Sequence, residues 1–463
     1  MRRVSALWTA SEAAAALDLA PSGDWTARNV SIDSRAVEPG DLFVAIRGEQ
    51  FDGHDFVDAA FAKGAVAAIT NRRISDGPQL IVADTLAGLA RLGEAARARS
   101  AAKVAAVTGS VGKTGTKEML ALALRDQGAT HANVGNLNNH IGAPLSLARL
   151  PREAAYAVFE LGMNHPGEIA PLSRMVRPSV AIITNVEPVH LEFFENEEGI
   201  ADEKAQIFAG LPVGGIAVLN RDNHHFKRLK RHADSLDLKV VTFGAGDLVD
   251  FRLLESQDEL DGVTVRASIN RQVLSYRIGC PGRHWAFNSL AVLAAIDALG
   301  GDVGKAAASL AGMTAPKGRG ATKMIELSGG GIATLIDESY NASPAAVRAA
   351  IAVLARRTPV ATGRRIFVLG DMLELGSNAA ALHAELAEDF TTLGIDRVHT
   401  VGPLSHGLHK ALPETTRGLH AAKSSEIVDA LKADLRPGDV ITIKGSLGTK
   451  MGVIVTALTA GVS

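Results

Sequence analysis

The sequence is poor in cysteine, in net charge and in long apolar runs, and each shortage excludes a class of protein. Its 463 residues include a single cysteine, Cys280. A disulfide framework is therefore excluded, a reducing cytoplasm is the expected compartment, and the lone thiol is predicted to be a packing residue. Lysine and arginine total 48 against 50 aspartate and glutamate, a formal charge of −2. Such a balance gives no support to a nucleic-acid partner or a polybasic membrane anchor.

Apolar runs are short throughout the chain. None approaches the roughly 20 apolar residues that span a bilayer, so we expect no membrane insertion. The opening segment 1–20 carries two arginines and many alanines, but Glu12 and Asp18 interrupt it and no apolar core of a signal peptide follows. Hydrophobic residues nevertheless make up 47% of the chain. That share is sufficient for two or three globular domains with cores of their own.

The most informative segment is 103–127, which reads KVAAVTGSVGKTGTKEMLALALRDQ. An apolar, β-branched run leads through a glycine-punctuated loop directly into an amphipathic helix, which predicts strand, phosphate loop and helix. In such a loop glycines let the backbone approach a polyphosphate, a lysine reaches the outer phosphates, and a threonine hydroxyl binds Mg²⁺. The corresponding residues are Gly109, Gly112, Lys113 and Thr114.

This loop departs from the general phosphate-loop pattern at Val107, where that pattern has a glycine. A glycine-rich turn that merely packs is the alternative interpretation. A Gly-Lys-Thr sequence after an apolar strand favours ATP binding instead. The residues expected to contact the nucleotide are Thr108, Gly109, Ser110, Val111, Gly112, Lys113 and Thr114.

Three units are predicted along the chain, and the fold class is α/β. Residues 1–100 precede the phosphate loop. Residues 101–317 alternate short apolar strands with helices, which indicates a mainly parallel, doubly wound sheet, with an antiparallel part expected at 250–278. Residues 318–463 repeat the alternation without a phosphate loop, which predicts a smaller second α/β domain.

Polar residues crowd the loops of the first unit. Arginines and glycine-rich turns can bind an anionic ligand through guanidinium and backbone N–H groups. Ordinary solvated loop polarity explains the same spacing equally well. The residues concerned are Ser34, Arg35, Arg47, Gly48, Asp52, Gly53 and His54.

Three side chains of the second unit are candidates for a metal site beside the nucleotide. Glu160 ends a predicted strand and His190 follows another, so both are expected at the sheet edge that carries Thr114. A carboxylate, an imidazole and a hydroxyl can bind a divalent metal beside ATP. The alternatives are a satisfied loop carboxylate and a capping histidine. Lys204 is predicted to begin a helix beyond His190, and as a bare cation it would repel magnesium.

Segment 221–232 is rich in arginine and histidine. Its histidines, His224, His225 and His232, are compatible with a metal site, but no second ligand cluster with zinc spacing accompanies them in the sequence. A solvated helix face is therefore predicted.

Further motifs accompany the phosphate loop. In chain order they are VTGSVGKTGTKEML, NVGNLNNHIGAPLSL, ELGMNHPGEI, TNVEPVHLEFF, EKAQIF, PGRHWAFNSLAV, DESYNASPAAVRAAI, VLGDMLELG and IKGSLG. This is the order seen in the Mur ligases of peptidoglycan synthesis, and the chain resembles that family over nearly its whole length. Segment 31–56 resembles the family's nucleotide-sugar domain.

The resemblance implies a three-domain Mur ligase architecture and an ATP-dependent amide ligase. NVGNLNNHIG and LGDMLELG point to members that join D-alanyl-D-alanine to UDP-N-acetylmuramoyl-tripeptide through an acyl phosphate. Members that add diaminopimelate or lysine typically carry Asp-Asn-Pro-Arg, which this sequence lacks. The implied enzyme works in the cytoplasm as a monomer, without nucleic acid or membrane insertion.

The resemblance also implies roles for individual residues. Lys204 stands where the family carries a carbamylated lysine, whose anionic carbamate would hold a second Mg²⁺. Glu160, His190 and Thr114 match the family's metal ligands.

Other implied contacts come from all three units. Asn288 matches an adenine-side asparagine, and Arg319 and Asp337 match residues that the third domain brings onto the nucleotide. Tyr340 lies beside them, either as a stacking partner or as a core tyrosine. The first-unit residues named above would hold the uridine diphosphate sugar. The motif NVGNLNNHIG adds the expected substrate contacts Asn136, Asn138 and Asn139.

Three positions depart from the family pattern, of which Glu338, in place of a frequent second aspartate, is a mild change. Gly115 replaces the usual serine or threonine, at an expected cost of about 0.5–1 kcal/mol in a helix. Leu447 stands where an arginine is common. Two alternatives therefore remain: a related ligase with another amine acceptor, and a nucleotide-sugar sensor without turnover. Retention of Lys113 and the metal-site residues argues against the sensor.

Overall fold

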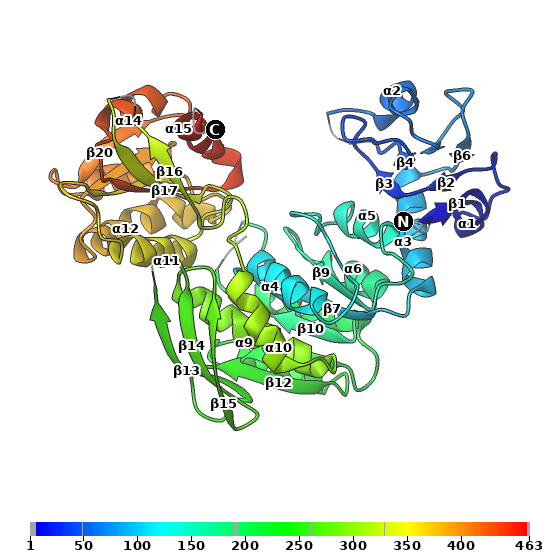
Figure 1. Cartoon of the computed structure of the whole chain (residues 1–463), viewed down its shortest axis with the longest axis horizontal. Helices are drawn as coiled ribbons and strands as arrows, with labels where there is room; N and C mark the ends of the chain where they lie inside the picture. The colour runs from blue at the N-terminus through cyan, green and yellow to red at the C-terminus, as the bar shows by residue number, and fades with distance from the viewer. Residues whose placement is uncertain (1–5, 49, 189–191, 260, 328, 461–463) are drawn as a thin grey trace.

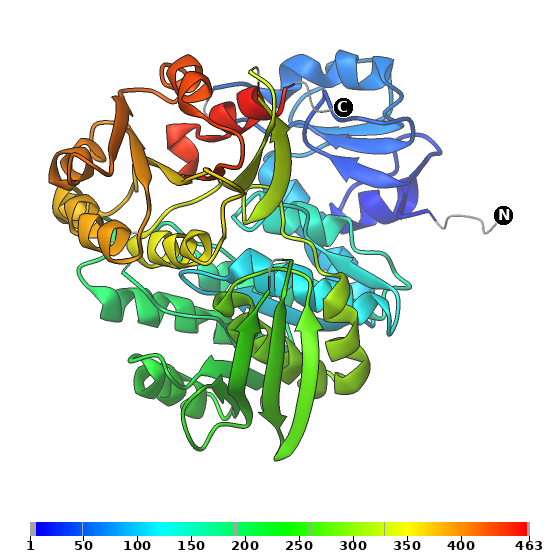
Figure 2. The same cartoon turned by 60° about the vertical axis from the view of Figure 1, so that its left-hand side comes forward.

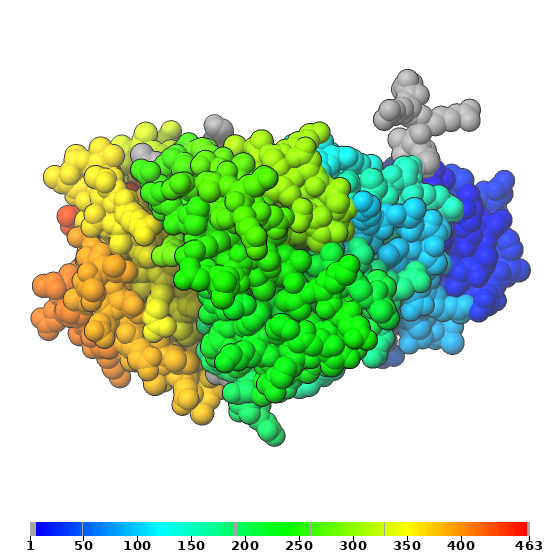
Figure 3. Space-filling model, turned by 90° about the horizontal axis from the view of Figure 1, so that it is seen from below, coloured from blue at the N-terminus to red at the C-terminus, as the bar shows by residue number. Residues whose placement is uncertain are grey.

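The structure, a computed structural model, divides the chain among three main sheets. The first part of the chain (blue) and the last part (yellow to red) stand on either side of the central part (cyan to green) in Figure 1. After a 60° turn both lie against the same side of the central part (Figure 2). Seen from below, the central part spans the middle of the molecule (Figure 3). The predicted α/β class is confirmed. The described residues are 6–48, 50–188, 192–259, 261–327 and 329–460.

The first unit is built on a small, wholly parallel sheet. The strand order is β3-β4-β5-β6, and a separate antiparallel pair, β1 and β2, lies beside it. The strands are β1 (Trp8–Thr9), β2 (Thr26–Ala27), β3 (Asn29–Ser31), β4 (Asp41–Val44), β5 (Ala67–Thr70) and β6 (Gln79–Ile81). The helices are α1 (Ala10–Ala16), α2 (Val57–Ala62) and α3 (Thr85–Arg99).

The central sheet has the order β15-β14-β13-β12-β11-β10-β7-β9-β8. It is parallel from β8 to β13 and antiparallel from β13 to β15, which confirms the antiparallel part expected at 250–278. The strands are β7 (Lys103–Thr108), β8 (Thr130–Ala132), β9 (Tyr156–Glu160), β10 (Val180–Ile183), β11 (Ile216–Asn220), β12 (Lys239–Gly244), β13 (Phe251–Asp258), β14 (Val263–Ile269) and β15 (Gln272–Ile278). The helices are α4 (Lys113–Arg125), α5 (Gly142–Ala148), α6 (Ile169–Val176), α7 (Glu197–Ala205), α8 (Phe226–Asp234), α9 (Arg283–Ala298) and α10 (Val303–Ser309).

The third sheet has the order β16-β17-β21-β18-β19-β20, parallel except for β16. Its strands are β16 (Ala321–Glu326), β17 (Ile332–Glu338), β18 (Arg365–Gly370), β19 (Arg397–Val401), β20 (Arg417–Ala421) and β21 (Val440–Lys444). Its helices are α11 (Pro344–Ala355), α12 (Ala379–Thr392), α13 (His406–Ala411), α14 (Val428–Asp434) and α15 (Gly452–Thr459). The three sheets fall within the three predicted units, whose boundaries stay a prediction.

The apolar cores are distributed unevenly over the three units. One core runs from the first unit into the central unit, because α3 packs against α5 and the indole of Trp8 donates a hydrogen bond to the carbonyl of Ala148 at 2.8 Å. A second core lies on the other face of the central sheet. The third unit has two cores, whose buried members all lie within 325–458. The first two units are thus joined by apolar packing, while the third packs mainly on itself.

Along the described part of the chain, no helix is both long enough and apolar enough to cross a membrane.

Candidate active site

The phosphate loop lies between β7 and α4, at the carboxyl edge of the central sheet, as predicted. Gly112 precedes α4 with a φ of 84°, and Gly109 has a φ of 148°, both in the region that favours glycine. A Cβ at Gly109 would lie 2.0 Å from the hydroxyl of Thr184, and one at Gly112 would lie 2.9 Å from the side-chain oxygen of Asn288. Close neighbours and backbone conformation therefore both require glycine at these positions.

Lys113 is folded back over this loop. Its Nζ donates a hydrogen bond to the carbonyl of Gly109 at 2.7 Å. Burial lowers the pKa of Lys113; the carboxylate of Glu160 opposes this effect and the guanidinium of Arg319 adds to it. A lysine in this position can leave the carbonyl and take a phosphate oxygen as its acceptor.

Glu160 and Thr114 form a buried oxygen pair beside the loop. Thr114 Oγ1 donates to Glu160 Oε2 at 2.8 Å, and the amide of Asn138 donates to Glu160 Oε1 at 2.8 Å. The side chain of Asn133 fixes the backbone of Glu160: its oxygen accepts the N–H of Glu160 at 2.9 Å, and its amide donates to the carbonyl of Glu160 at 3.3 Å. The carboxylate and the hydroxyl are oxygen ligands of the kind that Mg²⁺ prefers, so these residues fit a magnesium ion.

Lys204 lies in the last turn of α7, so the predicted helix start at this residue is wrong. The helix begins seven positions earlier, at Glu197, and the side chain of its N-cap Asn196 accepts the N–H of Gly199 at 2.9 Å. Lys204 is buried, with 1% of its surface exposed. Burial and the charge of Lys113 lower the pKa of Lys204 well below that of a free lysine. His190, the third predicted metal ligand, lies outside the described residues.

The third unit forms one wall of the cavity above the loop. This cavity, of about 290 Å³, is lined by the phosphate loop, by Trp285 and Asn288 of α9, and by Arg319 and Lys444 of the third unit. An adjoining cavity of about 560 Å³ contains Thr114, Asn136, Arg319, Tyr340 and Leu447 among its lining residues. The structure therefore brings the predicted phosphate-loop residues together with Asn288, Arg319 and Tyr340.

Arg319, Tyr340 and Asp337 are held relative to one another. The guanidinium carbon of Arg319 lies 4.2 Å from the ring centre of Tyr340, a cation–π contact. Asp337 is buried and accepts the N–H of Gly318 at 3.2 Å and the hydroxyl of Ser339 at 2.6 Å. Its carboxylate thus fixes the turn that carries Arg319, and it is not among the residues that line the two cavities.

The departure at Gly115 has a local explanation. A Cβ at this position would lie 2.8 Å from the ring of Trp285, which is buried against α4. Glycine at the first helical turn therefore makes room for the indole. Leu447 is 59% exposed and lines the larger cavity.

The predicted residues of the first unit follow β3 and β4, at the carboxyl edge of its parallel sheet. Arg35 is bound to Asp33 at 2.8 Å and is exposed, and its hydrogen bonds lower the pKa of Asp33 to about 2. His54 is buried: its Nδ1 lies 2.6 Å from Asp52, and its Nε2 accepts the N–H of Asn71 at 3.0 Å. His54 therefore holds the loop. Ser34, Arg47, Gly48 and Gly53 lie in the same two loops.

Lys117 is a residue that the sequence analysis missed. It is buried in α4, and its Nζ donates to the carbonyl of Asn133 at 2.8 Å and pairs with Glu118 at 2.6 Å. Lys117 thus anchors the loop that carries Asn136 and Asn138. Asn139 lies at the turn into α5, where its side-chain oxygen accepts the N–H of Gly142 at 2.9 Å. The sequence signal that could have identified Lys117 is the presence of a lysine on the apolar face of the helix, one turn after Lys113.

Comparison with known proteins places these features in context. Three family models match the chain: "Mur ligase family, catalytic domain" at residues 26–121, "Mur ligase middle domain" at 107–296, and "Mur ligase, glutamate ligase domain" at 318–447. The UDP-N-acetylmuramoyl-tripeptide--D-alanyl-D-alanine ligase of Escherichia coli (strain K12) is 38% identical over 438 residues, 94% of each chain. The enzyme of the same name from Bacillus subtilis (strain 168) is 34% identical over 439 residues, 93% of this chain and 92% of the relative.

Two solved structures have similar folds. A crystal structure of MurF from Acinetobacter baumannii matches with a TM-score of 0.83 and 31% identity, over 98% of this chain and 99% of that one. MurF ligase from Thermotoga maritima in complex with ADP matches with a TM-score of 0.77 and 27% identity, over 94% and 97%.

Proposed function

Because this chain belongs to the Mur ligase family, we propose that it joins D-alanyl-D-alanine to UDP-N-acetylmuramoyl-tripeptide in an ATP-dependent reaction of peptidoglycan synthesis. The observation that carries the proposal is the phosphate loop, whose Thr114 is hydrogen-bonded to the buried Glu160 and lines a cavity together with Arg319 and Lys444 of the third unit. The proposal includes a cytoplasmic, monomeric enzyme.

The chemistry follows from the charges of the reactants. A peptide carboxylate is a poor electrophile, so one of its oxygens first takes the γ-phosphoryl group of ATP, and ADP leaves. The amine of D-alanyl-D-alanine then attacks the acyl carbon of this acyl phosphate. The new C–N bond forms, the C–O bond to phosphate breaks, and the amine loses a proton. No protein nucleophile takes part.

Lys113 and Arg319 supply positive charge where the phosphoryl group is transferred. Lys113 exchanges the carbonyl of Gly109 for a phosphate oxygen, and Arg319 approaches from the third unit, held in place by Tyr340. Thr114 and Glu160 would hold a Mg²⁺ ion, which supplies further charge neutralisation on the phosphates. Exclusion of water by the third unit protects the acyl phosphate from hydrolysis.

Lys204 is proposed to carry a carbamate. A buried lysine with a lowered pKa presents an unprotonated amine, whose lone pair can attack CO₂. The Nζ–C bond forms, one proton is released, and the side chain becomes an anion. Such an anion suits a second magnesium ion, whereas the bare lysine does not. With His190 as a further ligand, this gives the proposed two-metal site.

The other proposed contacts surround the same cavities. Asn288 would face the adenine, and Tyr340 and Asn136 line the larger cavity, where the stem peptide and D-alanyl-D-alanine would meet. The loops after β3 and β4 would bind the uridine diphosphate sugar through Ser34, Arg35 and backbone N–H groups.

The test is release of phosphate from ATP and Mg²⁺ with UDP-N-acetylmuramoyl-tripeptide, with D-alanyl-D-alanine added or omitted. We expect release that requires both substrates, and a pentapeptide product by mass spectrometry. Release with a single amino acid and a shorter stem would instead identify a ligase for another amine acceptor. No phosphate release in any combination would support the nucleotide-sugar sensor.

A further inference from the structure

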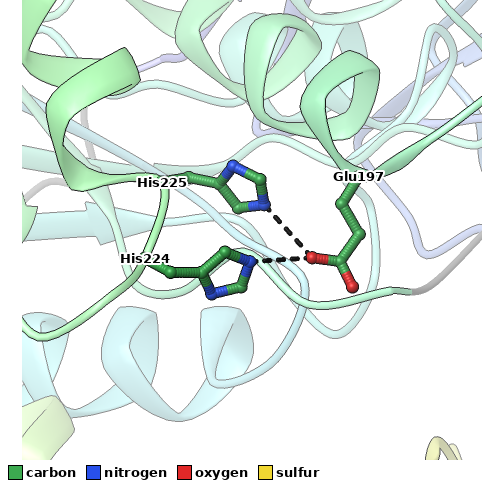
Figure 4. Close-up of side chains that lie close together, drawn as sticks. All are labelled: Glu197, His224 and His225. Atoms are coloured by element: carbon green, nitrogen blue, oxygen red, sulfur yellow. Dashed lines mark hydrogen bonds and ion pairs between the residues drawn. The ribbon is translucent and has the colours of Figure 1, made fainter.

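Two adjacent histidines of the central unit meet a glutamate that lies far away in the sequence. His224 and His225 follow β11, and Glu197 is the first residue of α7. The Nε2 atoms of both rings point at one oxygen of Glu197, at 2.8 Å from His224 and 3.2 Å from His225 (Figure 4). One ligand atom from each side chain lies within 4.8 Å of the other two.

The surrounding hydrogen bonds fix both sides of this cluster. Asn223 donates to the side chain of Asn185 at 2.5 Å and to the carbonyl of Val186 at 2.9 Å, and its own oxygen accepts the N–H of His225 at 3.0 Å. On the other side, Asn196 caps α7 and so orients Glu197. The three side chains are therefore held together by the fold around them, so that only a small movement is needed for binding.

We propose that Glu197, His224 and His225 bind a zinc-class divalent transition metal ion. Imidazole nitrogen and carboxylate oxygen are ligands that Zn²⁺ takes at about 2.0–2.2 Å, so tetrahedral ligand atoms lie roughly 3.4 Å apart. The two nitrogen–oxygen separations of 2.8 and 3.2 Å are close to that spacing. A small outward movement admits the ion, which replaces the protons that the histidines now share with Glu197.

The chemistry of the donors separates this site from the proposed magnesium site. Mg²⁺ prefers oxygen ligands in an octahedral arrangement, whereas two imidazoles and one carboxylate suit zinc, cobalt or nickel. Three protein ligands leave a fourth position for water, on the side where His224 is exposed, with 64% of its side chain accessible. The ion can therefore enter from solvent.

The site is connected to the nucleotide cavity through Asn185, whose side chain accepts a hydrogen bond from Asn223 of the histidine turn at 2.5 Å and donates one to the carboxylate of Glu187 at 2.6 Å. The N–H of Glu187 donates to Ser110 Oγ at 2.9 Å, and Ser110 Oγ donates to the carbonyl of Glu187 at 3.0 Å. Asn185, which binds the histidine turn through Asn223, lines the same cavity as Glu187. A bound ion would thus fasten the start of α7 to the loop behind the phosphate site.

Another histidine cluster provides a comparison within the same protein. His406, His409 and His420 of the third unit have ring centres 4.5 to 5.9 Å apart. The ligand atoms of these three histidines do not lie as close together as those of the proposed site. Within the described ranges, Glu197, His224 and His225 are the one group of three whose ligand atoms all lie within 4.8 Å of one another. His420 is therefore a suitable control position.

The test is a zinc titration of the full-length, metal-free protein against a chromophoric zinc chelator, with excess Mg²⁺ to occupy oxygen-rich sites. We expect one equivalent of Zn²⁺ to bind, and His224→Ala and Glu197→Gln to weaken binding about tenfold or more, since even the loss of a residue behind the ligands costs 10–100-fold. His232→Ala, which removes a histidine of the next helix, α8, that is bound to Asp202 at 2.8 Å, should bind as the wild type does.

Two further measurements protect the test from misinterpretation. Cobalt should give visible absorption bands of a tetrahedral site in the wild type and in His420→Ala, and none in His224→Ala. Zinc should also raise the melting temperature of the wild type but not that of His224→Ala, because an ion that binds only the folded state stabilises it. No stoichiometric zinc in the wild type, unchanged binding in His224→Ala, or loss in His420→Ala would each overturn the proposal.

Discussion

Two threonines of one helix turn, Thr114 and Thr116, have different surroundings although both are buried. Thr114 donates to Glu160, whereas the hydroxyl of Thr116 has no hydrogen-bond partner among the described atoms. We expect Thr114→Val to lower kcat/KM for ATP by about 10- to 100-fold and to raise the Mg²⁺ requirement, because it removes a proposed metal ligand. Thr116→Val should leave kcat/KM for ATP and the Mg²⁺ requirement within about twofold of the wild type, because replacing an unpaired hydroxyl costs little. Equal losses in the two variants would contradict the assigned role of Thr114.

The packing of Gly115 against Trp285 predicts a cost for the residue type usual in the family. Gly115→Ser should lower the free energy of unfolding by about 1 kcal/mol or more, since its Cβ would lie within 2.8 Å of the indole. Urea unfolding measures this. Gly312→Ser is the control, because a Cβ there meets nothing within 4 Å. A stable Gly115→Ser protein would mean that the indole moves aside at little cost.

The lowered pKa of Lys204 predicts a carbamate that depends on pH. The reaction with CO₂ needs the unprotonated amine, and a lowered pKa keeps Lys204 unprotonated at pH values where a free lysine is charged. We expect ¹³C-bicarbonate to give a carbamate signal by NMR, lost in Lys204→Met and retained in the surface variant Lys230→Met. The signal and the ligase activity should fall together as the pH is lowered and the amine gains a proton. A signal that persists in Lys204→Met would place the carbamate elsewhere.

At this scale, the sequence predicted which residues lie close together where this follows from their backbone positions. Lys113, Thr114 and Glu160 come at the ends of strands or the start of a helix, and a parallel sheet brings such positions together. It failed where a contact depends on distant partners. Lys117 was missed because its acceptor is a loop carbonyl. The contact of Asp337 with the nucleotide stays a prediction, and the carboxylate also binds the turn before Arg319.

Among the elements, α7 contributes to both proposed metal sites, because it carries Glu197 at its start and Lys204 near its end. Its cap, Asn196, predicts an effect on stability. Asn196→Ala should lower the free energy of unfolding by about 1 kcal/mol, because it leaves the N–H of Gly199 without its acceptor. Asn196→Ser should recover most of this loss, since serine also caps helices. Urea unfolding of the three proteins checks the order, and equal stability of the alanine and serine variants would contradict it.

The bounds of α7 were mispredicted for a physical reason. Both of its ends are in contact with other elements, so its buried residues include Glu203 and Lys204 and do not form a clear apolar stripe. The sequence likewise gives little sign of strand β16, because this edge strand buries only Ile325 and shows no alternation of apolar residues. The central strands β7, β9 and β10 were predicted, because strands covered on both faces are continuous apolar runs.

On the scale of the whole molecule, the third unit has cores of its own and meets the central unit at the nucleotide cavity. An ion pair between Arg356 and Asp258 also joins the two units. Movement of the third unit as a body would therefore break polar contacts and leave apolar cores intact. We expect small-angle X-ray scattering to show a smaller radius of gyration when an ATP analogue and UDP-N-acetylmuramoyl-tripeptide are added. Arg356→Ala should give a larger radius without ligands. Identical profiles with and without ligands would count against closure.

The joint between the first and central units differs from this one, because a shared apolar core holds the two units together. Trp8 is buried with its indole on Ala148, the guanidinium of Arg99 lies 3.8 Å from its ring centre, and Arg97 donates to the carbonyl of Val176 at 2.7 Å. The loops proposed to hold the uridine end and the loop proposed to hold the phosphates therefore stand at a set separation. A stem peptide anchored at one end must reach the other with its terminal carboxylate. Under the proposed function, this packed joint would set the length of the stem peptide, because a stem one residue too short would end before it meets the phosphoryl donor.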